Sequence, residues 1–234
     1  MSDRLYTDYP ELYDAIQSEW DYERDVAFVE AARERDDVDG DRLLEIGCGT
    51  GEHTKRFVEA GYDVTAIDPA GGMLSLAREK CGDGVTVLES GLPDPGLEGA
   101  FDVVVAIRGV VNHLPPGDLA SAFESVADLL ADGGVFVFDN SPLPPEGNHP
   151  AIDVGEFEDG TYARIVQMNP TGDGRLSWDA VIFRSDGEFF IDSREMTPFE
   201  DLAVAEELSQ QGFRFETHEG FGPDDARTVF VATR

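Results

Sequence analysis

The residues best suited to chemistry form a glycine-rich segment, Leu44-Glu45-Ile46-Gly47-Cys48-Gly49-Thr50-Gly51-Glu52, directly after an apolar run. Glycine lets the backbone turn tightly and lets a ligand approach closer than a Cβ atom would permit. Asp68 ends the next apolar run, seventeen residues after Gly51. A carboxylate at this place can accept hydrogen bonds from both hydroxyls of a ribose. The spacing therefore predicts a nucleotide-type cofactor at Gly47, Gly49 and Asp68.

The same segment departs from two other nucleotide-binding patterns. A dinucleotide-binding loop reads GxGxxG, and its third glycine packs a helix against a strand. Glu52 stands where that glycine would lie. A phosphate-binding P-loop needs a GK[ST] sequence, which does not follow here. A purely structural glycine turn, followed by an unrelated aspartate, is the competing interpretation.

A second candidate segment, Ala106-Ile107-Arg108-Gly109-Val110-Val111-Asn112-His113-Leu114, follows the fourth apolar run. Open α/β sheets bind ligands at the ends of such strands. His113 has a side chain that could accept a proton near neutral pH. Packing is the competing role for this histidine.

Aromatic residues gather near the N-terminus, namely Tyr6, Tyr9, Tyr13, Trp20 and Tyr22. Aromatic rings attract cations, so these residues could cover a positively charged ligand. The competing interpretation is a helix that packs its aromatic rings on the core.

Arginines occur in the strand-like runs beyond residue 160. Alternation places Tyr162 and Arg164 on one face of a strand, with Arg184 and Arg194 on neighbouring strands. Guanidinium groups that face a cleft could clamp a carboxylate or a phosphate. Pairing with the abundant surface Asp and Glu is the other role open to them.

Strands and helices must alternate to position these residues. The hydrophobic patterns predict helices over 11–35, 52–60, 72–80 and 118–130, the last of them ended by Gly133-Gly134. They predict strands over 42–46, 64–67, 85–88, 101–106 and 135–139. Strands that alternate with helices indicate a parallel sheet covered on both faces.

The pattern changes after Asn140. Three strand-like runs, over 161–168, 175–184 and 188–196, are joined by turn sequences typical of antiparallel hairpins. Thr197-Pro198-Phe199-Glu200 reads as a capping box that begins a helix running to Gln211. Two last strands, over 213–217 and 227–232, form a hairpin. We therefore expect a main domain of residues 1–140 and 198–234, with an antiparallel subdomain inserted over 141–197.

The charge balance is the outlier in the composition. Forty-nine Asp and Glu face seventeen Lys and Arg, for a net charge of −32, and Lys55 and Lys80 are the two lysines. Such a surface repels itself at ordinary salt and is screened at molar salt. An acidic, lysine-poor surface resembles that of cytosolic proteins from salt-accumulating halophiles. It also argues against a nucleic-acid partner, since a phosphate backbone binds basic surfaces.

The cysteines, the histidines and the apolar runs bear on disulfides, metal sites and membrane segments. Cys48 and Cys81 are too few for a disulfide framework, and the four histidines lack the spacing of metal ligands, so we expect no metal. No apolar run approaches the ~20 residues of a membrane helix, and the first residues lack the features of a signal peptide. A cytoplasmic protein without membrane contacts is expected.

The pattern E-x-G-x-G-x-G, followed by D-P-x-x-x-M-L, resembles that of the class I S-adenosylmethionine (SAM) methyltransferases. The resemblance implies a Rossmann-like α/β fold, with a seven-stranded, mostly parallel sheet, helices on both faces and a small antiparallel β insertion. In layout, the chain is nearest to small-molecule N-methyltransferases of the glycine and sugar N,N-dimethyltransferase types. Those enzymes share its tyrosine-rich N-terminal helix and the insertion after the fifth strand.

The resemblance also implies site residues. Ser90 stands where the family usually has an acid for the adenine amino group. His113 is the candidate catalytic base. Acceptor contacts are expected at Arg108, Asn112, Tyr162 and Arg164. Cofactor contacts are expected at Tyr13, Tyr22, Glu45, Gly47, Cys48, Gly49, Asp68, Pro69, Met73, Ser90, Gly91 and Ile107.

The expected function is therefore methyl transfer from SAM to a small molecule, with an amine as the favoured acceptor. Two other classes stay open. One is a non-catalytic SAM-binding protein, and the other is an NAD-dependent oxidoreductase, against which Glu52 speaks. The sequence leaves the acceptor and the oligomeric state open.

Overall fold

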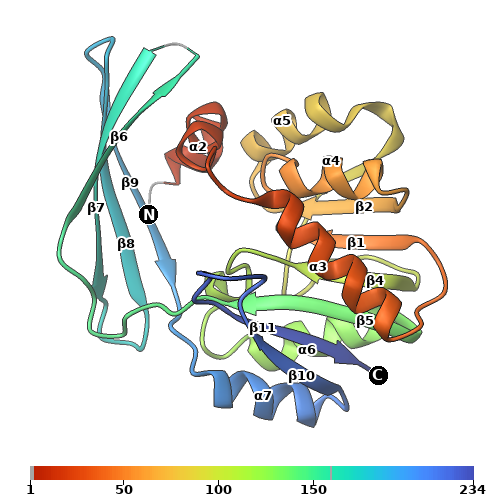
Figure 1. Cartoon of the computed structure of the whole chain (residues 1–234). Helices are drawn as coiled ribbons and strands as arrows, with labels where there is room; N and C mark the ends of the chain where they lie inside the picture. The colour runs from red at the N-terminus through yellow and green to blue at the C-terminus, as the bar shows by residue number, and fades with distance from the viewer. Residues whose placement is uncertain (1–2, 159) are drawn as a thin grey trace.

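The computed structural model describes residues 3–158 and 160–234, and it contains two β-sheets with the N-terminal helix α2 (Pro10–Ile16) between them (Figure 1). The larger sheet has seven strands in the order β10-β11-β5-β4-β1-β2-β3. These strands are β1 (Arg42–Ile46), β2 (Asp63–Asp68), β3 (Thr86–Glu89), β4 (Phe101–Ala106), β5 (Leu130–Asn140), β10 (Arg214–Glu219) and β11 (Thr228–Thr233).

The pairing in this sheet is parallel from β5 to β3, and β11 pairs antiparallel with both β5 and β10. The expected seven-stranded, mostly parallel sheet with an antiparallel final pair is confirmed. The helices that accompany it are α1 (Arg4–Thr7), α3 (Tyr22–Arg35), α4 (Glu52–Glu59), α5 (Gly71–Cys81), α6 (Leu119–Leu129) and α7 (Asp201–Gln210), with short 3₁₀ turns η1 (Gly82–Gly84) and η2 (Val111–His113).

Both faces of the central strands are buried, which is why they read as continuous apolar runs. In β4, Val104 and Ala106 pack into the core cluster that includes α6 and α7. The alternate residues Val103 and Val105 pack into the cluster that includes α3 and α4. The central strands are therefore held from both sides, and their carboxyl ends keep fixed positions.

The second sheet has four antiparallel strands in the order β6-β7-β8-β9, all between β5 and α7 in the chain. They are β6 (Ala151–Phe157), β7 (Gly160–Pro170), β8 (Leu176–Arg184) and β9 (Phe189–Met196). Its inner face packs against Leu5 and Leu12 of the N-terminal helices. Three strands were expected here, and β6 was not among them. Its apolar residues Ile152 and Val154 are exposed and are interleaved with Asp153 and Gly155, so no buried run marks the strand.

Three expected element boundaries were wrong. The segment expected as one helix over 11–35 is α2 and α3, because the side chain of Asp21 accepts a hydrogen bond from the backbone of Arg24 and begins a new helix there. Helix α6 ends at Leu129, within one residue of its expected end, but Gly133 and Gly134 lie within β5 and do not end the helix. The expected capping box does not form, because the Thr197 hydroxyl donates to the carbonyl of Leu114, and α7 begins only at Asp201.

Candidate functional site

A cavity of about 490 Å³ lies at the carboxyl ends of β1, β2 and β4. Its other walls come from the N-terminal helices and from β9 of the smaller sheet. The structure brings most of the predicted site residues together along this cavity: Tyr13, Tyr22, Gly47, Cys48, Gly49, Asp68, Pro69, Met73, Gly91, Ile107, Arg108 and His113.

The glycine loop forms the floor of the cavity. Gly47 has a φ of +72°, and a Cβ atom there would lie 2.5 Å from a methyl carbon of Val110. Gly49 has a φ of +54°, and a Cβ atom there would point into open space. Side chains at these positions would therefore either clash or fill the space that a ligand needs.

Asp68 locks the glycine loop in place. Its two carboxylate oxygens accept hydrogen bonds from the backbone N–H groups of Gly49, at 2.9 Å, and Ala70, at 2.8 Å. Burial raises the pKa of this carboxyl, and the two hydrogen bonds oppose the shift. Because each carboxylate oxygen has a second lone pair, Asp68 can still accept hydrogen bonds from a ligand in the cavity.

Glu45 and Ser90 support the cavity from behind rather than lining it. Glu45 is 4% exposed and accepts a hydrogen bond of 2.6 Å from the hydroxyl of Thr54. Burial raises the pKa of Glu45 to about 8, and the hydrogen bond from Thr54 opposes the shift. The hydroxyl of Ser90 donates to the carbonyl of Pro95 at 2.6 Å, which shapes the loop that brings Gly91 to the wall.

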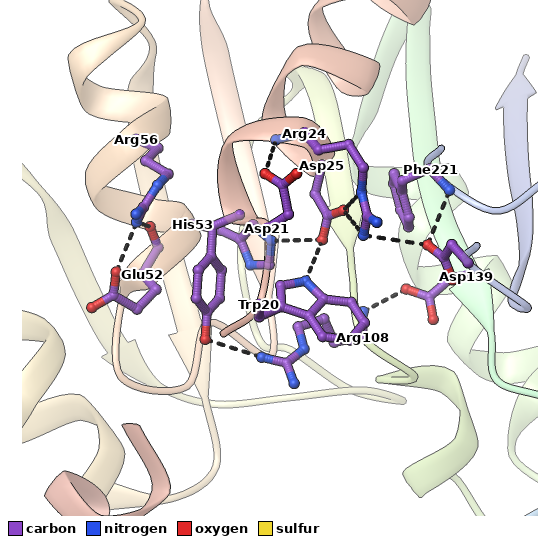
Figure 2. A network of polar contacts seen from close by, with 12 residues as sticks. Trp20, Asp21, Arg24, Asp25, Glu52, His53, Arg56, Arg108, Asp139 and Phe221 are labelled. Atoms are coloured by element: carbon purple, nitrogen blue, oxygen red, sulfur yellow. Dashed lines mark hydrogen bonds and ion pairs between the residues drawn. The ribbon is translucent and has the colours of Figure 1, made fainter. Parts of the chain in front are cut away.

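Arg108 joins the end of β4 to the N-terminal segment (Figure 2). Its backbone is left-handed, with a φ of +75°, and its N–H donates to the carboxylate of Asp139. Its guanidinium donates to the hydroxyl of Tyr22 at 3.1 Å and to the side chain of Gln17, and it lies 4.2 Å from the ring centre of Trp20. A strained backbone that aims one side chain at the segment above the cavity is typical of functional sites.

Behind Arg108, a network of buried polar groups surrounds Asp25 (Figure 2). The Asp25 carboxylate accepts hydrogen bonds from Trp20 and Arg24, both at 2.8 Å, and lies 3.2 Å from Nε2 of His53. Burial opposes ionisation of Asp25, but the hydrogen bonds from His53, Trp20 and Arg24 outweigh it and lower its pKa. The sequence analysis missed this network, because a single Asp in a helix carries no sign of its partners.

The cavity is also lined by His113, Tyr6, Arg175 and Arg194. The guanidinium of Arg194 lies 4.1 Å from the ring centre of Tyr6 and donates to Asp192. Arg194 is 8% exposed, and its Nε atom is buried without a hydrogen-bond partner in the described chain. Desolvation, together with the charges of Arg194 and Arg175, lowers the pKa of His113 to about 4, so its imidazole is neutral near pH 7.

Three predicted acceptor residues lie away from the cavity. Asn112 is fully buried and donates to the Asn140 side chain and to the carbonyl of Thr197, at 2.8 and 3.0 Å. Tyr162 packs against the N-terminal helices, and Arg164 pairs with Asp153 at 2.6 Å. Tyr162 and Arg164 belong to β7, whereas β9 is the strand that contacts the η2 turn, which holds His113. From the smaller sheet, the cavity is lined by Arg194 and Glu195 of β9, and by Arg175, which precedes β8.

Within residues 3–158 and 160–234, no group of three or more His, Cys, Asp or Glu side chains is arranged to hold a metal ion. None of the helices in the described part of the chain is long and apolar enough to cross a membrane.

The chain is similar in sequence to known methyltransferases. Residues 43–134, which carry the glycine loop and the cavity edge, match a family model described as a methyltransferase domain. A Bacillus subtilis protein, YqeM, provisionally named as a methyltransferase, is 30% identical over 68% of this chain and 62% of its own length. The chain therefore spans about three fifths of that relative. The dTDP-3-amino-3,6-dideoxy-alpha-D-glucopyranose N,N-dimethyltransferase of Streptomyces fradiae is 27% identical over 70% of this chain and 66% of its own length.

Solved structures extend the similarity over the smaller sheet as well. The sugar N-methyltransferase KedS8 from Streptoalloteichus is 26% identical, with a TM-score of 0.82 over 100% of this chain and 95% of that one.

Proposed function

Since the chain resembles the class I SAM-dependent methyltransferases, and is nearest in layout to small-molecule N-methyltransferases, we propose that it transfers a methyl group from SAM to a small-molecule amine. The observation that carries the proposal is one cavity lined both by the glycine loop and Asp68 and by His113 and Arg194. A cofactor held by the first group and an acceptor held by the second would share one space.

The residues present fit SAM as the cofactor. Gly49 leaves open the space that a Cβ atom would occupy, and Asp68 keeps lone pairs for a ribose beside it. The rings of Tyr13 and Tyr22 face the same space, and aromatic faces suit a positively charged ligand. When bound, SAM supplies an electrophilic methyl group on a positively charged sulfur. We assign cofactor contacts to the predicted residues that line the cavity, with Glu45 and Ser90 as their supports.

The acceptor end needs to position a nucleophile and exclude water. Methyl transfer depends mainly on holding an unprotonated nucleophile in line with the methyl group. The neutral imidazole of His113 could orient an amine by accepting one of its hydrogen bonds, while Tyr6 and Arg194 enclose the space. Arg108 was expected to contact the acceptor. We propose instead that it holds the N-terminal segment that covers the cavity.

The other two classes are less well supported by the site. Glu52 lies at the start of α4, in the place of the third glycine that packs the helix against the strand in a dinucleotide-binding loop. A non-catalytic SAM-binding protein would need no room for an acceptor in the same cavity. The acidic, lysine-poor composition argues against nucleic acid as the substrate and fits a cytoplasmic protein of a salt-accumulating cell.

The first test is calorimetric titration of SAM, S-adenosylhomocysteine and NADH into protein held at about 3 M KCl, where the surface charge is screened. We expect the first two to bind and NADH not to bind. Binding of NADH alone would overturn the methyltransferase proposal. A screen of small amines for methyl transfer then separates an enzyme from a non-catalytic binding protein.

His113→Ala tests the acceptor end separately. We expect turnover to fall by at least about tenfold while SAM affinity is retained. Because the pKa of His113 is lowered to about 4, the imidazole stays neutral as the pH falls from 8 to 5, and we expect no loss of the wild-type rate from its protonation in this range. Normal turnover of the variant would make His113 a packing residue.

A further inference from the structure

Lys80, one of the two lysines in the chain, lies where three helices meet beside the glycine loop. It belongs to α5, and its ammonium group pairs with the carboxylates of Asp14 in α2 and Glu52 at the start of α4. Between 19% and 28% of each of these three side chains is exposed. Salt screens partly buried pairs much less than exposed ones, so these contacts can operate at molar salt.

Asp14 connects Lys80 to the glycine loop. One oxygen of its carboxylate accepts a hydrogen bond from the ammonium group of Lys80, and the other accepts one from the hydroxyl of Thr50. Thr50 lies within the glycine loop and lines the cavity, as does Tyr13, the residue before Asp14. A single carboxylate therefore joins the N-terminal segment above the cavity to the floor below it.

Glu52 holds Lys80 from the side of α4. Its carboxylate accepts hydrogen bonds from Lys80 and from Arg56, both at 2.7 Å, and the second is drawn in Figure 2. Burial opposes ionisation of Glu52, but the hydrogen bonds from Lys80 and Arg56 outweigh it and lower its pKa. Lys80 thus stands between two carboxylates, Asp14 on the N-terminal segment and Glu52 on the cavity wall, which would repel each other without it.

The N-terminal segment lies directly against α5. A Cβ atom at Gly72 would lie 2.6 Å from the carbonyl oxygen of Tyr6, so the start of α5 has no room for a side chain there. Helices α1 and α2 both contact α5, and α2 is drawn beside it in Figure 1. This close approach brings the carboxylate of Asp14 within reach of Lys80.

We propose that Asp14 and Lys80 are a positioning pair that clamps the N-terminal segment over the bound cofactor and slows its release. The inference rests on the proposed function, because it takes the ligand of the cavity to be SAM. The pair lies behind the cavity and acts through Tyr13, Thr50 and Glu52, which line it. Without the charge of Lys80, Asp14 and Glu52 would face each other unshielded, and the N-terminal segment would open more often.

Lys80→Gln tests the pair, and Lys55→Gln is its matched control. Lys55, the other lysine, is exposed on α4, so its substitution changes the net charge by the same amount. At about 3 M KCl we expect Lys80→Gln to release SAM at least about fivefold faster than the wild type, because a hydrogen bond between charged groups is lost. Lys55→Gln should release SAM at the wild-type rate.

A double-mutant cycle shows whether Asp14 and Lys80 act together. Asp14→Asn alone should also speed the release of SAM. The double variant Asp14→Asn, Lys80→Gln should release SAM no faster than Lys80→Gln, since the pair is already broken and the repulsion from Glu52 is relieved. Effects of the two substitutions that simply add would show independent roles and overturn the pair.

Hydrogen exchange in the ligand-free protein tests the clamp without SAM. We expect the backbone amides of α2 to exchange at least about threefold faster in Lys80→Gln and in Asp14→Asn than in the wild type and Lys55→Gln. The amides of β4, in the core, should exchange at wild-type rates, which separates local opening from a loss of folding.

The two measurements fail in different ways. Wild-type exchange over α2 in both Lys80→Gln and Asp14→Asn would overturn the clamp. Faster exchange with an unchanged release of SAM would overturn its role in holding the cofactor. A wild type that binds no SAM would instead overturn the proposed function, and the exchange of α2 would then decide by itself whether the pair holds the N-terminal segment.

Discussion

At the residue scale, Asp68 ties the glycine loop to the cavity. Its carboxylate holds Gly49 and Ala70 through their backbone N–H groups, so it orders the floor even before a ligand binds. A ribose bound here would add hydrogen bonds to a charged acceptor, which are stronger than neutral ones. We therefore expect cofactor affinity to be most sensitive to substitution of Asp68.

Asp68→Ala should weaken SAM binding by at least about tenfold, roughly 1.4 kcal/mol, in calorimetric titration. Asp63→Ala, at the exposed opposite end of β2, is the matched control and should bind SAM as the wild type does. An affinity within about twofold of the wild type would remove Asp68 from the ribose site.

Glu45 should make the protein less stable as the pH rises. Its pKa is about 8 in the folded chain and 4.5 as an ordinary glutamate, so the folded state binds the extra proton between these values. Stability is therefore fully present below about pH 4.5 and is lost toward pH 8. Glu45→Gln removes the titratable carboxyl group and keeps a side-chain oxygen that can accept the hydrogen bond from the Thr54 hydroxyl.

Denaturant unfolding at several pH values checks this prediction. Relative to the wild type, Glu45→Gln should gain roughly 2–4 kcal/mol in the free energy of unfolding between about pH 5 and pH 8. Parallel curves for the two proteins would mean that Glu45 is ionised in the folded state throughout this range.

The structure brings predicted residues together where they are close in sequence. Gly47, Gly49 and Asp68 are joined by one strand, one loop and the next strand, so their spacing alone places them at one sheet edge. Arg175 was not predicted as a site residue, and Tyr6 was named only among the N-terminal aromatic residues, because their approach to His113 depends on how the smaller sheet sits against the main one. Arg194 was named among the arginines of the smaller sheet, but the sequence could not identify β9 as the strand beside the cavity.

At the element scale, the N-terminal segment covers the cavity and is held in place by side chains from the main sheet. Both Arg108 and Arg227 place their guanidinium groups against the ring of Trp20, with centroid distances of 4.2 and 4.6 Å. The hydroxyl of Tyr22 adds a hydrogen bond to Arg108. These contacts connect α3 to the ends of β4 and β11, so the cover and the floor of the cavity are physically linked.

Tyr22→Phe tests the cover, because it keeps the ring and removes the hydrogen bond to Arg108. The loss of one such bond is worth about 1 kcal/mol, so we expect SAM to dissociate roughly fivefold faster in stopped-flow measurements. Tyr9→Phe is the matched control, since the Tyr9 hydroxyl bonds to Arg4 at 3.0 Å. Equal dissociation rates for wild type and Tyr22→Phe would show that the bond does not hold the cover.

Element prediction failed where tertiary contacts override local signals. The sequence around Thr197 has the composition of a helix start, yet its hydroxyl is taken by Leu114, eighty-three residues earlier in the chain. Strand β6 has no buried apolar run, because one of its faces is exposed and its stability comes from pairing with β7. The buried strands β1 and β4 have the bounds that were expected from their continuous apolar runs.

At the scale of the whole molecule, the net charge dominates. With −32 charges, the folded chain repels itself at low ionic strength, and salt at molar concentration shortens the range of that repulsion to about 3 Å. We therefore propose that the protein is adapted to high salt. The apolar contacts of the core are of ordinary kind, so screening rather than packing should control the salt response.

Thermal melting between about 0.2 and 3 M KCl checks this proposal. We expect Tm to rise by at least about 10 °C over this range, with the steepest change at the low-salt end, where screening changes most. Sucrose at matched water activity is the control, since it does not screen charge. A Tm that is flat or falls with added KCl would contradict the adaptation.

The buried side-chain amide of Asn112 has a consequence for how proteins with this fold can diversify. Asn112 bonds to Asn140 and Ser141, where the chain leaves the main sheet, and to Thr197, where it returns. Both ends of the intervening segment are thus fastened at a single point beside His113. A segment held in this way can be lengthened, shortened or exchanged as a cassette without shifting the strands that carry the glycine loop. In the function that we propose, the acceptor could then be changed by altering one contiguous stretch of the gene.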